Sequence, residues 1–216
     1  MRNILRVVVV AAAVLLMLSA SALAQTQITI GASTNGTVEF TPSGSNSIMS
    51  FTGSCGGSSC VAGDAYIGSN VGTYEMWITG NNPILSPSGT PNIYAVNMNG
   101  GTMNFSFSVG TSTFAGTIQL TTLSNTSAPE FIGTLTVSSS TGIFAALWKA
   151  GSIVPLDFTI SMSPGSPSIG GTTVATGTIS SGEITGGTPA PEPASIALIG
   201  SGLLAIGGFV KRRMRK

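Results

Sequence analysis

The segment Thr102–Val109 reads TMNFSFSV, and its apolar and polar side chains alternate along the whole stretch. Its Met, Phe and Val residues fall on one face, and its Asn and Ser residues fall on the other. Such a period of two predicts a half-buried β-strand. Pro155–Met162 (PLDFTISM) repeats the pattern. Both segments are typical of an antiparallel sheet with one face in a core and the other in water.

Further strand candidates lie between turn signals on both sides of these two segments. We expect turns at Asn-Gly, Ser-Gly and related pairs, namely Asn35-Gly36, Ser43-Gly44, Ser88-Gly89, Asn99-Gly100 and Thr141-Gly142. The additional predicted strands are Gln27–Ile30, Thr37–Phe40, Ile48–Phe51, Tyr74–Ile78, Ile93–Met98, Thr117–Leu123, Ile132–Val137 and Thr173–Ile179. Many short strands favour an all-β fold, an antiparallel sandwich or barrel. We expect this β-rich ectodomain to span residues 25–179, followed by a Gly/Ser/Thr linker over 180–190.

The charges divide the chain into a middle and two ends. Its 216 residues include 8 Lys and Arg, 7 Asp and Glu, and no His. Seven of the eight basic residues lie within the first six or the last six positions, and Lys149 is the eighth. The absence of His excludes His-based catalysis and His-ligated metal sites. The segment 25–190, with one basic and six acidic residues, is no basic nucleic-acid binder.

The first 24 residues read MRNILRVVVVAAAVLLMLSASALA. Two arginines precede the apolar run Val7–Leu18, and Ala22 and Ala24 supply the small residues at −3 and −1 of a cut before Gln25. These three parts predict a secretory signal peptide over 1–24, removed by signal peptidase. The alternative is an uncleaved N-terminal anchor, which the shortness of the apolar run disfavours.

The chain ends on an uncharged segment and a basic tail. Residues 194–210 carry no charge over 17 positions, and as a helix they would reach about 25 Å, close to the bilayer core of about 30 Å. The tail that follows contains Lys211, Arg212, Arg213, Arg215 and Lys216. By the positive-inside rule this tail would keep the C-terminus in the cytoplasm, with a transmembrane helix in the inner membrane and the β-rich part outside.

Three features at this end occur in a specific order: Pro191-Glu192-Pro193, the Gly-containing apolar segment 194–210, and the basic tail 211–216. In this order they resemble the PEP-CTERM sorting signal of Gram-negative bacteria, over residues 191–216 only. The segment has also been labelled an ice-binding protein C-terminal domain, a label that concerns the anchor alone. The resemblance implies processing near Pro-Glu-Pro by an exosortase, and delivery to the cell surface or an exopolysaccharide matrix. An ordinary single-pass anchor is the alternative. The two prolines also keep this stretch extended and open to a protease.

The two cysteines of the chain, Cys55 and Cys60, lie in the stretch SCGGSSC. Export brings them to an oxidising compartment, where an isolated pair commonly closes. Two thiols without His fall short of the roughly four ligands of a metal site. We therefore predict a structural disulfide, and no metal or other cofactor.

The acidic residues show no catalytic or calcium-binding motif. Asp64 and Glu75 flank a region that contains Tyr66, Tyr74 and Trp77. Carboxylates beside aromatic rings are the residue types of which a sugar-binding site is built, and a pair of carboxylates can cleave glycosides. Two acids 11 residues apart also arise by chance, so we expect no enzymatic activity.

Two functional hypotheses follow. The first is an exported, non-catalytic protein of the cell surface or exopolysaccharide matrix. The second is a carbohydrate-binding module, or less readily a glycan-cleaving one, in the same matrix. A row of exposed Trp and Tyr on one sheet face would favour the second, and a buried aromatic core would favour the first. Strand faces rich in Ser and Thr protect edges poorly, so lateral association and a monomer both remain open.

Overall fold

The computed structural model describes residues 27–186, and residues 1–26 and 187–216 lie outside the described part. Residues 27–186 form thirteen strands in one antiparallel sheet and one short 3-10 helix, η1. No helix in this part of the chain is long and apolar enough to cross a membrane. In chain order the elements are β1 (Gln27–Asn35), β2 (Val38–Ser43), β3 (Asn46–Phe51), β4 (Gly53–Cys55), β5 (Ser58–Ile67), β6 (Asn70–Thr79), β7 (Ile84–Pro87), β8 (Ile93–Asn97), β9 (Thr102–Val109), β10 (Ser112–Ser124), β11 (Glu130–Ser140), η1 (Gly142–Phe144), β12 (Ile153–Met162) and β13 (Ala175–Thr185).

Eight of these strands close the sheet into a ring. Their order is β1-β5-β6-β9-β10-β11-β12-β13, and β13 pairs with β1 again. The closing register joins Gln27 to Thr185 and Ile30 to Gly182. A closed ring leaves no free strand edge, and it corresponds to the barrel of the two expected architectures.

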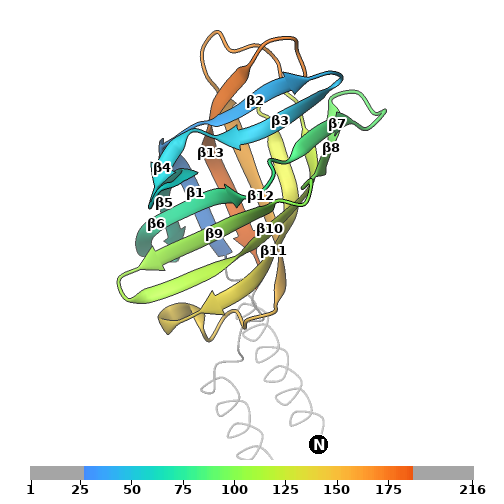
Figure 1. Ribbon diagram of the computed structural model, residues 1–216. Coiled ribbons are helices and arrows are strands. Elements are labelled where there is room, and N and C mark those ends of the chain that lie inside the picture. The colour runs from blue at the N-terminus through green and yellow to red at the C-terminus, as the bar shows by residue number, and fades with distance from the viewer. Residues whose placement is uncertain (1–26, 187–216) are drawn as a thin grey trace, which may run out of the picture. The chain divides into compact units, whose positions relative to one another are not determined.

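A second ring branches from the first and shares four of its strands. The strands β2, β3, β7 and β8 connect β13 to β10 by another route. On β13, Ala175–Gly177 pairs with β2, whereas the segment 182–185 pairs with β1. On β10, Thr122–Ser124 pairs with β8, and the segment 112–118 pairs with β9. The long strands β10 to β13 therefore form a wall that serves both rings, and the opposite wall is split in two (Figure 1).

The core fills the space inside these rings. On β9 the alternation places Met103, Phe105 and Phe107 inside with no exposed surface, as predicted. One group of aromatic rings contains Phe40, Phe131 and Phe158. A second group contains Tyr74, Phe105, Phe107, Phe114, Phe144 and Trp148. Both groups belong to one continuous apolar cluster.

The ten segments predicted as strands all occur as strands, with longer bounds in most cases. The expected turns contain glycines with positive φ, namely Gly36, Gly44, Gly89, Gly100 and Gly142. The sequence pattern did not predict β4, β5 and β7. Two of these are only three and four residues long. The third, β5, is made largely of small residues, including the consecutive Ala62 and Gly63, which weakens its hydrophobic pattern.

The structure corrects the predicted start of the linker. We expected a Gly/Ser/Thr linker from Ser180, but β13 continues to Thr185. The side chain of Ile184 is fully buried, and Gly182 lies so close to β12 that a Cβ would come within 2.6 Å of the Asp157 carbonyl oxygen. Small residues here serve close strand packing, and composition alone cannot distinguish that role from a linker. Residues 187–190 of the expected linker lie outside the described part.

Candidate functional site

The residues predicted to direct export and sorting lie outside the described residues 27–186. They are Ala22, Ala24 and Gln25 at the signal-peptide cut, Pro191, Glu192 and Pro193 at the processing segment, and Lys211, Arg212, Arg213, Arg215 and Lys216 in the tail. The described part nevertheless fixes where both terminal segments attach. Gln27 pairs with Thr185, so the chain enters and leaves the closed sheet at neighbouring positions.

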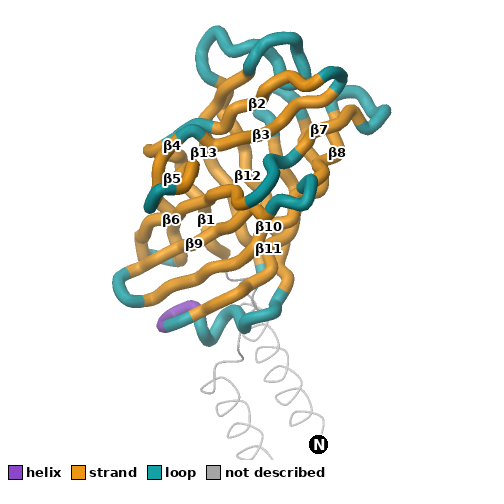
Figure 2. The backbone as a smooth tube through the Cα atoms, viewed as in Figure 1, coloured by secondary structure: helices purple, strands orange, loops and turns teal. Residues whose placement is uncertain are grey.

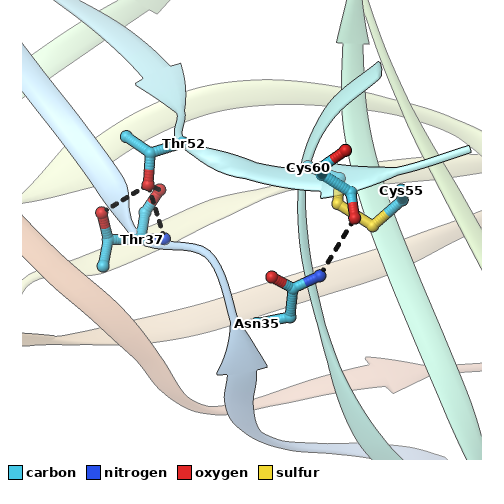
Figure 3. The surroundings of a disulfide bond; sticks show 6 residues. Asn35, Thr37, Thr52, Cys55 and Cys60 are labelled. Atoms are coloured by element: carbon cyan, nitrogen blue, oxygen red, sulfur yellow. Dashed lines mark hydrogen bonds between the residues drawn. A yellow bond between two sulfur atoms is a disulfide. The ribbon is translucent and has the colours of Figure 1, made fainter. Parts of the chain in front are cut away.

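The predicted disulfide between Cys55 and Cys60 is confirmed. It joins β4 to β5 with the two Cα atoms 5.7 Å apart (Figure 3). The turn between these strands contains Gly56 and Gly57, both with positive φ, a backbone conformation that residues other than Gly rarely adopt. Asn35 at the end of β1 donates a hydrogen bond to the Ser54 carbonyl oxygen at 3.2 Å. The disulfide therefore closes a small hairpin of β4 and β5, and this hydrogen bond holds the hairpin against the end of β1.

The two carboxylates of the possible sugar site lie on neighbouring strands. Asp64 on β5 is opposite Thr73, and Glu75 on β6 is opposite Ala62. Both acidic side chains are exposed on the outer face. Positions related in this diagonal way lie about 7–8 Å apart, and their Cβ atoms lie somewhat closer. The fold thus brings the acidic pair onto one face, although it encloses neither residue.

The aromatic residues near this acidic pair do not form a row on the surface. Tyr74 is fully buried and donates a hydrogen bond to the Gly31 carbonyl oxygen at 3.3 Å. Burial, with a further contribution from the Asp64 charge, raises the pKa of the Tyr74 hydroxyl above its usual range. Trp77 is half-buried, and Tyr66 is 39% exposed. Among residues 27–186, the Trp and Tyr side chains therefore contribute more to the core than to a platform for sugar rings.

A second group of acidic residues lies on the outer face of the shared wall, and the sequence analysis did not identify it. Asp157 on β12 is directly opposite Glu183 on β13, and Glu130 on β11 lies close by. Burial, the charge of Glu183 and then that of Glu130 raise the pKa of the Asp157 carboxyl, and a backbone hydrogen bond at Glu183 opposes this rise. These residues are 26 or more positions apart in the sequence, so no local motif connects them.

This acidic group extends into a strip across five neighbouring strands, β11, β12, β13, β1 and β5. The register continues from Asp157 to Ile132 on one side, and from Glu183 through Thr29 to Tyr66 on the other. The strip is polar in the middle and carries an exposed apolar residue at each end. Among the described residues, no group of three or more His, Cys, Asp or Glu side chains has the arrangement of a metal site.

Comparison with known protein families gives a match at the C-terminal end of the chain. Residues 189–215 match the PEP-CTERM protein-sorting motif. The matched range contains the Pro191–Pro193 segment, the uncharged stretch and most of the basic tail. The resemblance predicted from the sequence is therefore confirmed, and it covers this terminal segment alone. No curated protein and no solved structure matches the chain.

The PEP-CTERM motif assigns a route to this protein. It indicates export, a sorting signal that anchors at the membrane, and processing by an exosortase on the way to the cell surface. The described domain, residues 27–186, is the part of the chain that precedes this motif. Its outer surface offers strand faces rich in Ser and Thr and two small groups of carboxylates.

Proposed function

We propose that this chain is a non-catalytic protein of the cell surface or exopolysaccharide matrix, delivered there by its PEP-CTERM motif. The observation that carries the proposal is the match at residues 189–215, which follows a closed β domain only a few residues after its last strand ends. In this interpretation the signal peptide 1–24 starts export. The anchor segment then holds the chain in the inner membrane until an exosortase cuts near Pro191–Pro193.

The non-catalytic part of the proposal is supported by the chemistry of the domain. The chain has no His, and its one basic residue between Arg6 and Lys211 is Lys149. The carboxylates of the described part lie on outward strand faces, where Asp64 and Glu75 are exposed and the other four are half-buried. Most of its large aromatic side chains are buried, which favours a packing or matrix role over a carbohydrate-binding module.

The sorting part is tested by changing the processing segment. Replacing residues 191–193 with Ala is expected to leave the exported protein in the inner membrane. Deleting 194–216 is expected to release a soluble secreted domain, which serves as the matched control for export itself. Fractionation and N-terminal sequencing provide the readout, with Gln25 expected as the first residue of the mature chain. Normal processing of the 191–193 variant would contradict the proposal.

The non-catalytic part is tested with the purified secreted domain and the producer's own exopolysaccharide. We expect no release of sugar fragments, and no change when Asp64→Asn or Glu75→Gln is introduced. Glycan cleavage that either substitution abolishes would overturn this part. Binding of the polysaccharide that is lost on Tyr66→Ala would instead favour the carbohydrate-binding module, because Tyr66 carries the most exposed aromatic ring in the described residues.

A further inference from the structure

The end of the domain at which the chain enters and leaves has a composition of its own. Around this end lie the β5–β6 turn at residues 68–69, the β9–β10 turn at 110–111, and the connection 141–152 between β11 and β12. Together with the flanking Val71 and Ile153 we call these residues the terminal rim. Gly186, the last described residue, lies beside the first residues of β12, because a Cβ on it would be 3.3 Å from Val154. Figures 1 and 2 show η1, within this connection, at the same lower end.

The terminal rim exposes apolar side chains that nothing in the domain covers. Ile153 is 68% exposed, Val71 is 56% exposed, and Ile143 is 43% exposed. The connection reads TGIFAALWKAGS, and its buried Phe144 and Trp148 hold it against the core. Three of the six large exposed hydrophobic residues of the described part therefore lie at one end of the domain. A single exposed apolar residue is normal on a protein surface, but three at one end are a distinct feature.

The charge of the terminal rim also differs from that of the rest of the domain. Lys149, the one basic residue between Arg6 and Lys211, lies exposed in the connection 141–152. Neither the two turns nor this connection contains Asp or Glu. All six acidic residues of the segment 25–190 thus lie outside the turns and the connection. An apolar surface with a basic residue suits a bilayer interface with anionic lipids.

The length of the chain beyond Gly186 limits how far this end can lie from the membrane. Seven residues, 187–193, separate it from the uncharged segment that begins at Ala194. Fully extended, they span at most about 25 Å. While the C-terminal segment is anchored, Gly186 thus stays within about this length of the segment, whereas the opposite end of β13 is about 35 Å further along the strand.

We propose that the terminal rim docks on the lipid surface of the membrane in which the C-terminal segment is anchored. This inference rests on the proposed membrane stage of sorting. Ile143, Ile153 and Val71 enter the headgroup region, and Lys149 lies against anionic phosphate groups. Docking fixes the orientation of the domain on its short tether. Cleavage then removes the tether and leaves only the weak contact of the terminal rim, so the domain departs.

A tryptophan reporter at the terminal rim tests this proposal in the full chain. The chain is reconstituted in vesicles of phosphatidylethanolamine and phosphatidylglycerol whose acyl chains carry bromine, a short-range quencher of indole fluorescence. The Ile153→Trp variant reports on the terminal rim, and the Val174→Trp variant is the matched control at the opposite end, where Val174 is 43% exposed. The unaltered chain provides the background from its two native tryptophans. Flotation of the vesicles measures anchoring in the same samples.

The expected result is a blue shift and strong quenching for Ile153→Trp, and neither for Val174→Trp. Adding Ile143→Ser to the Ile153→Trp variant is expected to reduce the quenching several-fold. Equal quenching at the two sites, or none at either, with flotation intact would overturn the docking alone. Loss of flotation would overturn the proposed anchoring and the docking with it. Hydrogen exchange of the unaltered chain provides a second measurement, since amides in 141–152 should exchange more slowly on vesicles than in the chain lacking 194–216.

Discussion

Asp157 and Glu183 place two negative charges directly opposite one another on the outer face of the shared wall. Like charges in this arrangement destabilise a sheet. Burial first, and then the charges of Glu183 and Glu130, raise the pKa of the Asp157 carboxyl, so the folded state favours its protonated form. When folding raises the pKa of a group, the free energy of unfolding falls as the pH rises from the unfolded pKa of the group through its folded pKa. The penalty therefore grows as the pH rises above the ordinary pKa of Asp.

We predict that Asp157→Asn stabilises the domain at pH 7. The gain should be less than about 1 kcal/mol, since water screens charges on an outer face. The gain should disappear as the pH falls below the ordinary pKa of Asp, where the wild-type carboxyl is also neutral. Urea unfolding between pH 3 and pH 7 measures it. Glu39→Gln is the control, because Glu39 pairs with Ser50 and Thr176 rather than with an acid. A gain that is independent of pH would contradict the explanation.

A glycine in the shared wall offers a steric prediction. Gly116 is buried on β10, and a Cβ there would lie 2.5 Å from the Thr136 carbonyl oxygen and 3.1 Å from Leu135. We expect Gly116→Ala to destabilise the domain by about 1–3 kcal/mol, because the contact is with backbone that must move. Gly171→Ala is the control, since its nearest neighbour is the Ser168 carbonyl oxygen at 3.1 Å in an exposed connection. Similar losses for both substitutions in thermal unfolding would refute the steric account.

At the scale of an element, the β4–β5 hairpin depends on the disulfide more than on packing. β4 has three residues, none of them buried, and pairs with β5 alone. Replacing both Cys55 and Cys60 by Ser should lower the free energy of unfolding by about 2 kcal/mol, from the entropy of so short a loop. Amide exchange should increase first in residues 53–59. Reducing the disulfide of the wild-type protein should lower the free energy of unfolding by the same amount. If a reductant also lowered the free energy of unfolding of the variant, the loss could not be assigned to the disulfide.

At the scale of the whole molecule, β13 decides whether the rings close. Its C-terminal half, which ends at Thr185, pairs with β1 and β12. Its N-terminal half, which begins at Ala175, pairs with β2 and β12. A chain of residues 25–187 should unfold cooperatively. A chain that ends at residue 179 should aggregate, because it opens the first ring and exposes strand edges on β1 and β12. Circular dichroism and size-exclusion chromatography distinguish the two. A cooperative transition in the shorter chain would show that closure is dispensable.

The part of this fold that could be predicted from the sequence is its local part. Alternation along Thr102–Val109 indicates a strand because the period of side chains is a property of one backbone segment. Asn-Gly and Ser-Gly pairs mark turns for the same reason. Strand β5 was missed because its small residues gain their burial from neighbours on β1 and β6. The Asp157–Glu183 pair could not be found without the register that brings the two residues together.

By itself the sequence determined the all-β class, the position of the disulfide and the sorting motif, because each depends on residues that are close together in the chain. The tertiary structure alone decided that the sheet closes into two rings with a shared wall, and that β13 continues to Thr185. It also decided that Tyr74 belongs to the core and that the exposed Val71, Ile143 and Ile153 lie at the end where the chain leaves. These outcomes depend on pairings between distant strands, whose energy comes from burial that no single segment can achieve.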